Sequence, residues 1–483
     1  MVFSSAVFLF VFLSAVLGLC LLPVGLKIKN AILIVASIIF YAYGEPVYVL
    51  MMLASSIVNY VFGRLLGRIS FKPEDVNVYG PAPYKTRGRK LILFFAVFFN
   101  IGILGVVKYT DFVLGNINTL FSLNIDLPGI ALPIGISFFT FQALSYVIDV
   151  YRDPSLSQKS YPAVLLYISL FPQLVAGPIV KYKDIEDQIY NRKMTLEGEV
   201  DGIRRFSKGL FKKIFIANIM GGMADHIFMH DAGSLNAACA WLGAVTYTLQ
   251  IYYDFSAYSD MALGLGKMFG FSFKENFNHP YCSVGIHDFW DRWHMSLSTW
   301  FKEYVYIPLG GNRKGKFRCE LNKLIVFLLT GIWHGANWTF ILWGMIHGVA
   351  NVIEDTVLPL GKIKLKALGN MITMLIVTLA FVFFRADNIA YGLDYIKVMF
   401  TGFNTDLLPT GIFAEQMTVY NIITVVIAVL FSYPLLASCE KKLSGKLGDK
   451  KLYLYCPLSM LLLILSILRI SSGAYNPFIY FNF

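Results

Sequence analysis

Two histidines, each with an ionisable imidazole side chain, lie within long apolar stretches of the sequence. His294 lies in RWHMSLSTWFKEYVYIPLGGNR, and His334 lies in TGIWHGANWTFILWGMIHG. An ionisable side chain at membrane depth is costly unless it has a partner or a role, so both histidines are functional candidates. Desolvation favours the neutral imidazole, which is the form that a general base needs near pH 7.

His334 is the better placed of the two for such a base. Gly331 and Gly335 bracket it with four-residue spacing, which lets another backbone approach closely. On a continuous helix, Asn337 and Trp338 would share its face at offsets of three and four. The alternative is a histidine that only packs between helices and hydrogen-bonds across the bundle.

The segment around His294 predicts an amphipathic helix that lies in the membrane interface. Ser298, one helical turn beyond His294, is expected to be a hydrogen-bonding neighbour. The alternative for His294 is a headgroup-level histidine that hydrogen-bonds to a carbonyl. The apolar residues that recur at helical intervals are Trp290, Trp293, Leu297, Trp300, Phe301 and Tyr304.

Composition defines the class of protein that must position these residues. The chain has 483 residues, of which 57% are hydrophobic and 15% charged, whereas a soluble protein has about 25% charged residues. Apolar runs recur from the first residues to the last. We therefore predict one all-α integral-membrane domain over residues 1–483, with about 11–12 transmembrane helices plus re-entrant and interfacial helices.

Basic residues predict how the chain threads the membrane, because short loops rich in Lys and Arg stay in the cytoplasm. With the N-terminus outside, Lys27 and Lys29, the basic stretch 64–90, the lysines of 362–366 and those of 441–451 all fall inside. Both termini are then extracellular, in a multi-pass protein of the cell membrane. The net charge of +11 follows from these loops, so it indicates no nucleic-acid role.

Two segments are predicted to depart from simple membrane spans. Pro162 to Val180 contains PQLVAGP, whose prolines and glycine favour a re-entrant segment over the alternative of a proline-kinked span. The stretch YYDFSAYSDMALGLGKMFGF carries Asp254 and Asp260, and it predicts a short or re-entrant helix with its acids facing the interior. The six cysteines show no paired spacing, and no metal site is expected.

The histidine motifs carry a resemblance to a known family. The run from NFNHPY through DFWDRWHMSLSTWFKEYVYIPLGGNR, followed by LLTGIWHGANWTFILWGMIHG, resembles the membrane-bound O-acyltransferases, in particular their alginate O-acetyltransferase branch. FPQLVAGPI, YYDFSAYSDMALGLG and the terminal NPFIYFNF support the resemblance, which extends from about Ile130 onward. Ala257 stands where the family pattern leads us to expect glycine.

The resemblance implies that His334 is the catalytic histidine and His294 a second functional histidine. It also implies a cytoplasmic acyl thioester as donor, with acetyl-CoA expected, and no further cofactor. The acyl group would move across the membrane, through an extracellular acyltransferase or esterase-like partner protein, to a cell-surface or secreted polysaccharide. In this scheme the expected substrate-binding residues are Asn337, Trp333, Trp293 and Ser298.

Two other functions remain open from the sequence. The related D-alanyl transfer to teichoic acid takes its thioester from a carrier protein, although GGNR and NPFIYFNF favour acetyl transfer. A non-catalytic polysaccharide exporter or scaffold belongs to a different class. Transporters often show inverted repeats, and the sequence shows no matching halves.

Overall fold

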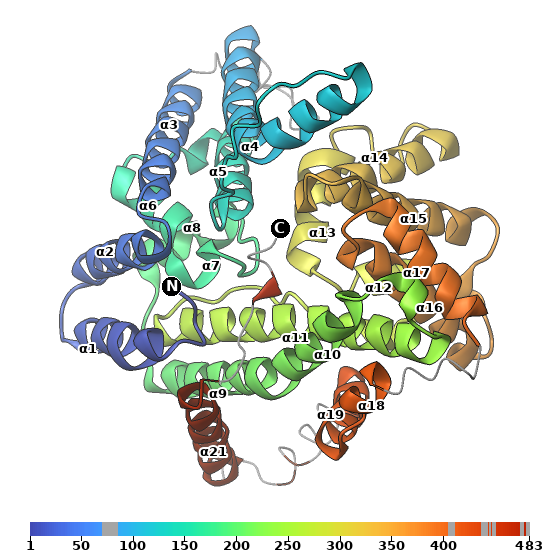
Figure 1. The fold of residues 1–483 in the computed structure, drawn as a ribbon. Helices are drawn as coiled ribbons and strands as arrows, with labels where there is room; N and C mark the ends of the chain where they lie inside the picture. The colour runs from blue at the N-terminus through green and yellow to red at the C-terminus, as the bar shows by residue number, and fades with distance from the viewer. Residues whose placement is uncertain are drawn as a thin grey trace. The chain divides into compact units, whose positions relative to one another are not determined.

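The computed structural model describes residues 1–69, 86–403, 411–435, 443, 446, 451–473 and 478–479. Within these residues the chain is helical, and none of them lies in a β-strand, which confirms the predicted all-α class. The chain divides into two compact units, one of Met1–Gly202 with Ala262–Lys274 and one of Ile203–Met261 with Glu275–Phe483. Helices α9 (Leu196–Lys212) and α11 (Ala237–Met268), both labelled in Figure 1, belong partly to each unit.

The first unit is held by buried polar pairs as well as by apolar packing. The amides of Asn59 and Asn100 bond reciprocally between α3 and α4, at 3.1 and 2.7 Å. Arg89 is buried and donates to backbone carbonyls, among them that of Tyr151 at 2.8 Å. Such groups must be paired when they leave water. The helices are η1 (Val7–Leu13), α1 (Ser14–Leu21), α2 (Leu26–Gly44), α3 (Tyr48–Arg68), α4 (Arg87–Phe121), α5 (Ile136–Arg152), η3 (Pro154–Leu156), α6 (Tyr161–Ser169), α7 (Phe171–Leu174) and α8 (Tyr182–Asn191).

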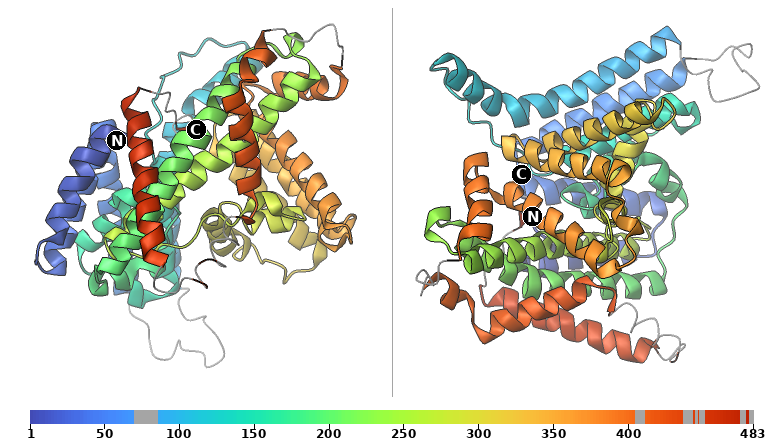
Figure 2. Two further views of the ribbon diagram at one scale, coloured as in Figure 1. Left: turned by 90° about the horizontal axis from the view of Figure 1, so that it is seen from below. Right: turned by 90° about the vertical axis from the view of Figure 1, so that its right-hand side faces the viewer.

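The second unit carries both candidate histidines. Its central pair is α14 with α15, which lie side by side (Figures 1 and 2). Its helices are η4 (Lys213–Ala217), α10 (Asn218–Phe228), η5 (Ala232–Ser234), η6 (Pro280–Cys282), α12 (Ile286–Trp290), α13 (Met295–Phe301), η7 (Lys302–Tyr306), α14 (Lys316–His334), α15 (Trp338–Thr356), η8 (Leu360–Lys362), α16 (Lys366–Arg385), α17 (Ile389–Thr401), α18 (Ile412–Gln416), α19 (Val419–Ser432) and α21 (Lys451–Ser471).

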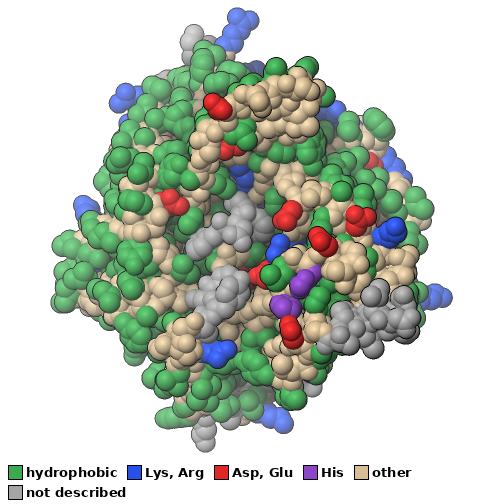
Figure 3. Space-filling view, in the orientation of Figure 1, with side chains coloured by type: hydrophobic (Ala, Val, Ile, Leu, Met, Phe, Trp, Pro, Cys, Tyr) green, Lys and Arg blue, Asp and Glu red, His purple; other side chains and the backbone are tan. Residues whose placement is uncertain are grey.

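The described residues include five helices long and apolar enough to cross a membrane. They are Leu26–Gly44, Tyr48–Arg68, Arg87–Phe121, Lys366–Arg385 and Tyr453–Ser471, and shorter apolar helices are Val7–Leu21 and Val419–Ser432. Hydrophobic side chains cover much of the face seen in Figure 3, as a lipid-facing surface requires. The protein is a multi-pass membrane protein, and the number of about 11–12 spans stays a prediction.

The segment predicted to be re-entrant is broken where the prolines and glycine predict. Helix α6 ends at Ser169, a single turn forms α7, and the chain after Leu174 is irregular. All of residues 163–182 are buried. A side chain at Gly177 would lie 2.6 Å from the Cα atom of Gln173, so the tight turn needs a glycine. The predicted break is confirmed, and its backbone is surrounded by protein.

The prediction of a separate short helix around the two aspartates is wrong. Helix α11 continues without interruption through both acids (Figure 1). The acids do face the interior, because Asp254 lies 2.6 Å from the ammonium of Lys213 and Asp260 lies 2.8 Å from that of Lys212. A buried acid is tolerated inside a helix when a cation neutralises it, so the two charges do not end the helix.

Glycines bring α14 and α15 into close contact, as the spacing of Gly331 predicts. A Cβ atom on Gly331 would lie 2.5 Å from the carbonyl oxygen of Phe340. From the other helix, a Cβ atom on Gly344 would collide with the carbonyl oxygen of Phe327 and lie 3.1 Å from the Cα atom of Gly331. The two backbones therefore pack directly, which holds the C-terminal end of α14 in place.

Gly344→Ala is expected to lower both the stability and the activity of the protein. The added methyl group must push α15 away from α14, and overpacking of this kind costs about 1–3 kcal/mol. Thermal unfolding of the purified protein in detergent measures the loss. Gly102→Ala in α4 is the matched control, because a Cβ atom there meets nothing within 4 Å. An unfolding temperature for Gly344→Ala equal to that of the control would contradict the close approach.

Candidate active site

His334 is the last residue of α14, and its side chain is buried among aromatic rings. Its ring centroid lies 4.9 Å from that of Trp333, 4.9 Å from that of Trp343 and 5.1 Å from that of Phe384. The side chain is 6% exposed. Because the rings come from α14, α15 and α16, the position of the imidazole depends on how these three helices pack.

The prediction that Asn337 and Trp338 share a helical face with His334 is wrong. Helix α14 ends at His334, and Gly335 is extended, with φ −166°. Asn337 is instead the N-cap of α15, where its side-chain oxygen accepts from the backbone N–H of Thr339 at 3.1 Å. Its amide nitrogen donates to the backbone carbonyl of Asp387 at 2.9 Å. Asn337 therefore orients the start of α15.

The prediction of one continuous helix around His294 is also wrong. The segment forms α12 and α13, with His294 between them in the left-handed region at φ 43°. The break is held from outside the segment, since the N–H of Met295 donates to the carbonyl of Asn276 at 3.0 Å and the N–H of Asn278 to that of Arg292 at 3.0 Å. A non-glycine residue in this conformation is strained, and such strain clusters at functional sites.

Hydrogen bonds define the protonation of His294. Its Nδ1 lies 3.1 Å from the side-chain oxygen of Asn276. The same oxygen accepts from the backbone N–H of Ser296 at 3.2 Å, and the Asn276 amide nitrogen donates to Ser259 at 3.1 Å. Because the Asn276 oxygen can only accept, Nδ1 carries the proton and Nε2 keeps its lone pair. Among the residues that the structure describes, Nε2 has no hydrogen-bond partner.

Burial keeps this imidazole neutral. His294 is 1% exposed and lies outside the five membrane-spanning helices. Loss of hydration on burial lowers the pKa of His294 from its ordinary value of 6.5 to about 3. At neutral pH it is therefore an uncharged base with a free lone pair, which is the state that proton abstraction requires.

Trp333 brings the two histidines into one site. Its ring centroid lies 6.2 Å from that of His294 and 4.9 Å from that of His334. Trp293, also predicted to bind substrate, packs on the rings of Phe289 at 5.5 Å and Tyr281 at 6.2 Å. The aromatic surroundings exclude water from the two imidazoles, which strengthens any electrostatic interaction formed there.

Ser298 is a hydrogen-bonding neighbour of His294 through its backbone, because its N–H donates to the carbonyl of His294 at 3.1 Å. Its hydroxyl donates to the backbone carbonyl of Trp290 at 3.3 Å. The serine near the imidazole is Ser296, whose hydroxyl lies 3.4 Å from Nδ1 and donates to the Asn276 oxygen at 2.9 Å. Ser298 is therefore held one helical turn from His294, but its hydroxyl is not the one nearest to the imidazole.

Sequence reasoning missed Asn276, and it predicted only an interfacial or packing role for a third histidine of this region, His347. Asn276 lies 18 positions before His294, and its place in NFNHPY was the only signal. His347 is fully buried, with ring centroids 5.1 Å from Trp343 and 5.2 Å from Trp290. Neither ring nitrogen of His347 has a hydrogen-bond partner among the described residues. Since Trp343 also contacts His334, three imidazoles lie along one aromatic cluster.

The two described residues of the C-terminal motif NPFIYFNF contact α11 in the second unit. The N–H of Ile479 donates to the carboxylate of Asp254 at 2.8 Å, and the ring of Phe478 stacks on Tyr258 at 4.9 Å. The rest of NPFIYFNF lies outside the described residues. Asp254, already paired with Lys213, therefore joins the end of the chain to α11.

Comparison with known proteins identifies the family of the chain. The sequence profile of the membrane-bound O-acyltransferase family matches residues 91–393. The chain is 38% identical to a Pseudomonas putida protein named "Probable alginate O-acetylase AlgI", over 100% of both chains. It is 32% identical to a Helicobacter pylori peptidoglycan O-acetyltransferase, over 100% of this chain and 98% of the relative. A teichoic acid D-alanyltransferase of Streptococcus thermophilus is 30% identical over 52% of this chain and 68% of the relative.

These matches determine the family and the enzyme class of the protein. The family profile covers more than half of the chain, and the alginate O-acetylases match it from end to end. The enzyme class follows, and a non-catalytic exporter or scaffold is not the function that the family supports. The chain belongs to the membrane-bound O-acyltransferase family, in its alginate O-acetylase-like branch, and it is an O-acyltransferase.

Proposed function

We propose that this enzyme transfers an acetyl group from cytoplasmic acetyl-CoA, across the membrane, for O-acetylation of a cell-surface or secreted polysaccharide. The observation that carries the proposal is the pair of buried imidazoles, His294 and His334, whose ring centroids lie 6.2 and 4.9 Å from that of Trp333. The relatives that align over their full length are named for acetyl transfer to alginate or peptidoglycan. The D-alanyl-transferring relative aligns over about half of the chain.

In the proposed reaction, neutral His334 acts as the general base. It removes the proton from an acceptor hydroxyl as the oxygen attacks the thioester carbonyl, so a C–O bond forms and the C–S bond breaks. The leaving thiolate then takes the proton from the imidazolium and departs as the free thiol of coenzyme A. His294, with its lone pair on Nε2, orients the acceptor hydroxyl or relays its proton, and Trp333 holds both rings in place.

The direction of transfer follows the predicted threading of the chain. Acetyl-CoA enters from the basic cytoplasmic side, where Lys and Arg side chains attract its phosphates. The acceptor is reached from outside, through an extracellular acyltransferase or esterase-like partner protein that completes polysaccharide modification. Both chain termini lie on that outer side. The thioester is the only small molecule that this scheme requires, and no further cofactor takes part.

A donor-competition experiment tests this function. The purified enzyme is reconstituted in vesicles and given radiolabelled acetyl-CoA on one side, or a carrier protein loaded with radiolabelled D-alanine. We expect label from acetyl-CoA to reach acceptor on the opposite side and His334→Ala to prevent it. Label transferred from the D-alanyl carrier and not from acetyl-CoA would overturn the proposal in favour of D-alanyl transfer. Acetyl transfer confined to one side would overturn the transmembrane step.

A further inference from the structure

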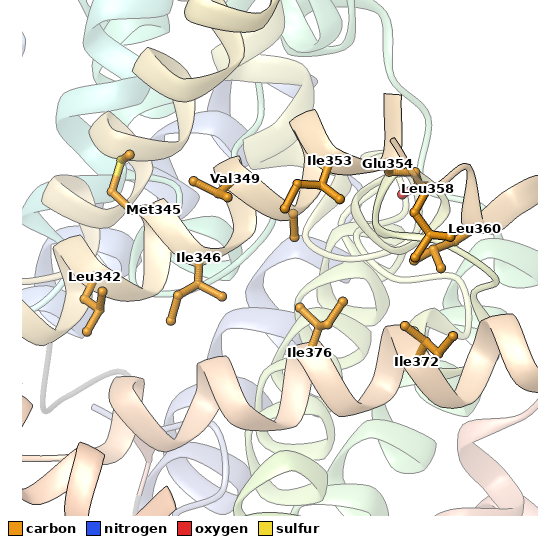
Figure 4. A pocket seen from close by; sticks show the side chains of 11 residues that line it. Leu342, Met345, Ile346, Val349, Ile353, Glu354, Leu358, Leu360, Ile372 and Ile376 are labelled. Carbon is orange, nitrogen blue, oxygen red and sulfur yellow. The ribbon is translucent and has the colours of Figure 1, made fainter. Parts of the chain in front are cut away.

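An open apolar groove runs between α15 and α16 (Figure 4), and neither His294 nor His334 is among its lining residues. Its volume is about 420 Å³. One wall is formed by side chains of α15, including Leu342, Ile346 and Val349, and the other by Ile372 and Ile376 of α16. A groove of this composition offers no hydrogen bonds, so its occupant must be a hydrocarbon.

The length of the groove matches one leaflet of a bilayer. On α15 its lining extends from Leu342 to Ile353, which at 1.5 Å per residue is roughly 16 Å. The hydrocarbon core of a bilayer is about 30 Å thick, so one leaflet is half of that. A single acyl chain of a phospholipid therefore fits the length of the groove.

The one acidic residue in the lining does not make the groove polar. The carboxylate of Glu354 accepts from the backbone N–H groups of Ile286 at 2.6 Å and His287 at 3.1 Å. These amides start α12, whose N-terminal dipole a carboxylate stabilises. The carboxylate of Glu354 is thus hydrogen-bonded within the protein.

Positive charge is concentrated where the groove ends. The lining finishes at Leu358 and Leu360, and the next residues carry the exposed lysines Lys362, Lys364 and Lys366. Lys366 is also the first residue of α16, one of the five helices able to span a membrane, so these ammonium groups lie at the border between hydrocarbon and water. A phosphate at this border would be attracted by all three.

We propose that the groove is a binding site for an anionic phospholipid. One acyl chain lies between α15 and α16, and the headgroup phosphate is held by Lys362, Lys364 and Lys366. The predicted threading puts these lysines in the cytoplasm, which is the side where anionic lipids attract basic segments. The lipid stabilises the hairpin of α14 and α15 from outside and takes no part in acyl transfer.

Native mass spectrometry of the delipidated enzyme tests the site, with dioleoyl phosphatidylglycerol and dioleoyl phosphatidylcholine as probes. We expect phosphatidylglycerol to bind more tightly than phosphatidylcholine. Each Lys→Gln change at 362, 364 or 366 should weaken the binding of phosphatidylglycerol about fivefold. Val349→Trp should weaken the binding of both lipids about tenfold or more. The larger side chain keeps part of the acyl chain out of the groove, and each methylene lost in this way weakens binding about fourfold. Acyl transfer by the lysine variants should stay measurable, which separates this site from the proposed catalysis.

Matched variants control for general effects of charge and bulk. The charge control removes three charges from another exposed basic connection, by Arg313→Gln, Lys314→Gln and Lys316→Gln. The control for bulk is Val429→Trp, because Val429 is 41% exposed and Val349 is 44% exposed. Neither set should change lipid binding. Equal binding of the two lipids, or an equal loss in the control set, would overturn the site. A hydrophobic polypeptide that co-purifies and excludes lipid from the groove would also overturn it, by assigning the groove to a partner helix.

Discussion

His334→Ala is expected to leave a folded, membrane-inserted protein and to reduce acyl transfer by about 10²–10⁴-fold, the usual contribution of a positioned general base. The substitution removes the imidazole from between the rings of Trp333, Trp343 and Phe384, and no solvent enters easily to replace the base. Initial rates with labelled acetyl-CoA in vesicles measure the effect, with the amount of inserted protein measured in parallel.

Two further variants make this test specific. His334→Asn keeps a polar side chain of smaller volume at the end of α14 but cannot accept a proton at neutral pH, so it should be as inactive as the alanine variant. His230→Ala is the matched control, because His230 lies after α10 and is partly exposed. Transfer at the rate of the unmodified enzyme by a folded His334→Ala protein would remove His334 from the mechanism.

His294→Gln is expected to reduce transfer by about 10²-fold, at the lower end of the range for an acid–base residue. The glutamine fills most of the space beside Phe255, whose ring lies 4.6 Å from the imidazole, but it presents no lone pair equivalent to Nε2. Measurement of the initial rate at saturating acetyl-CoA separates this effect from weaker donor binding. A change in KM alone would indicate that His294 binds the donor and moves no proton.

The partner of His294 offers a sharper readout, because it controls the charge of the ring. Asn276→Asp places a carboxylate 3.1 Å from Nδ1 and favours the imidazolium, which raises the pKa of His294. We expect activity that is lost as the pH falls towards that raised pKa and is recovered at higher pH. Asn278→Asp, the same change at an exposed neighbour, should leave the pH profile as it is. Equal profiles for the two variants would exclude the Nδ1 contact from catalysis.

The lowered pKa of His294 also predicts how stability depends on pH. Since the folded protein binds this proton only near pH 3 and the unfolded chain binds it near pH 6.5, the unfolded state takes up more protons as the pH falls between these values. Stability therefore decreases from about pH 6.5 towards pH 3. His294→Gln should reduce this decrease, as measured by thermal unfolding in detergent at pH 7 and pH 5.

Much of the architecture follows from local rules that a sequence displays directly. In lipid every backbone N–H and C=O group must be hydrogen-bonded within its own segment. Apolar runs long enough to cross a membrane therefore form helices. The prolines and glycine of PQLVAGP disfavour a continuous helix, and the chain is broken at this motif, after Ser169 and again after Leu174. The small residue Gly331 likewise predicts a close helix contact, which α15 provides.

Other features could not be obtained from periodicity, because they depend on groups distant in the chain. The acids of α11 suggested a short helix, but Lys213 and Lys212 neutralise them and the helix continues. The stripe around His294 suggested one amphipathic helix, but backbone bonds to Asn276 and Asn278 break it. Periodicity describes which face a residue would occupy if its helix continued, and it carries no information about the partner that ends the helix.

The candidate site likewise has features that the sequence determines and features that depend on groups distant in the chain. The histidines could be singled out from residue type and apolar surroundings, since the cost of burying an ionisable group is a property of that group alone. Their common proximity to the Trp333 ring, the tautomer of His294 and the placement of Asn337 as a helix cap are properties of the packed helices. They arise because hydrogen-bond donors and acceptors from separate segments must be matched once water is excluded, and that matching exists only in three dimensions.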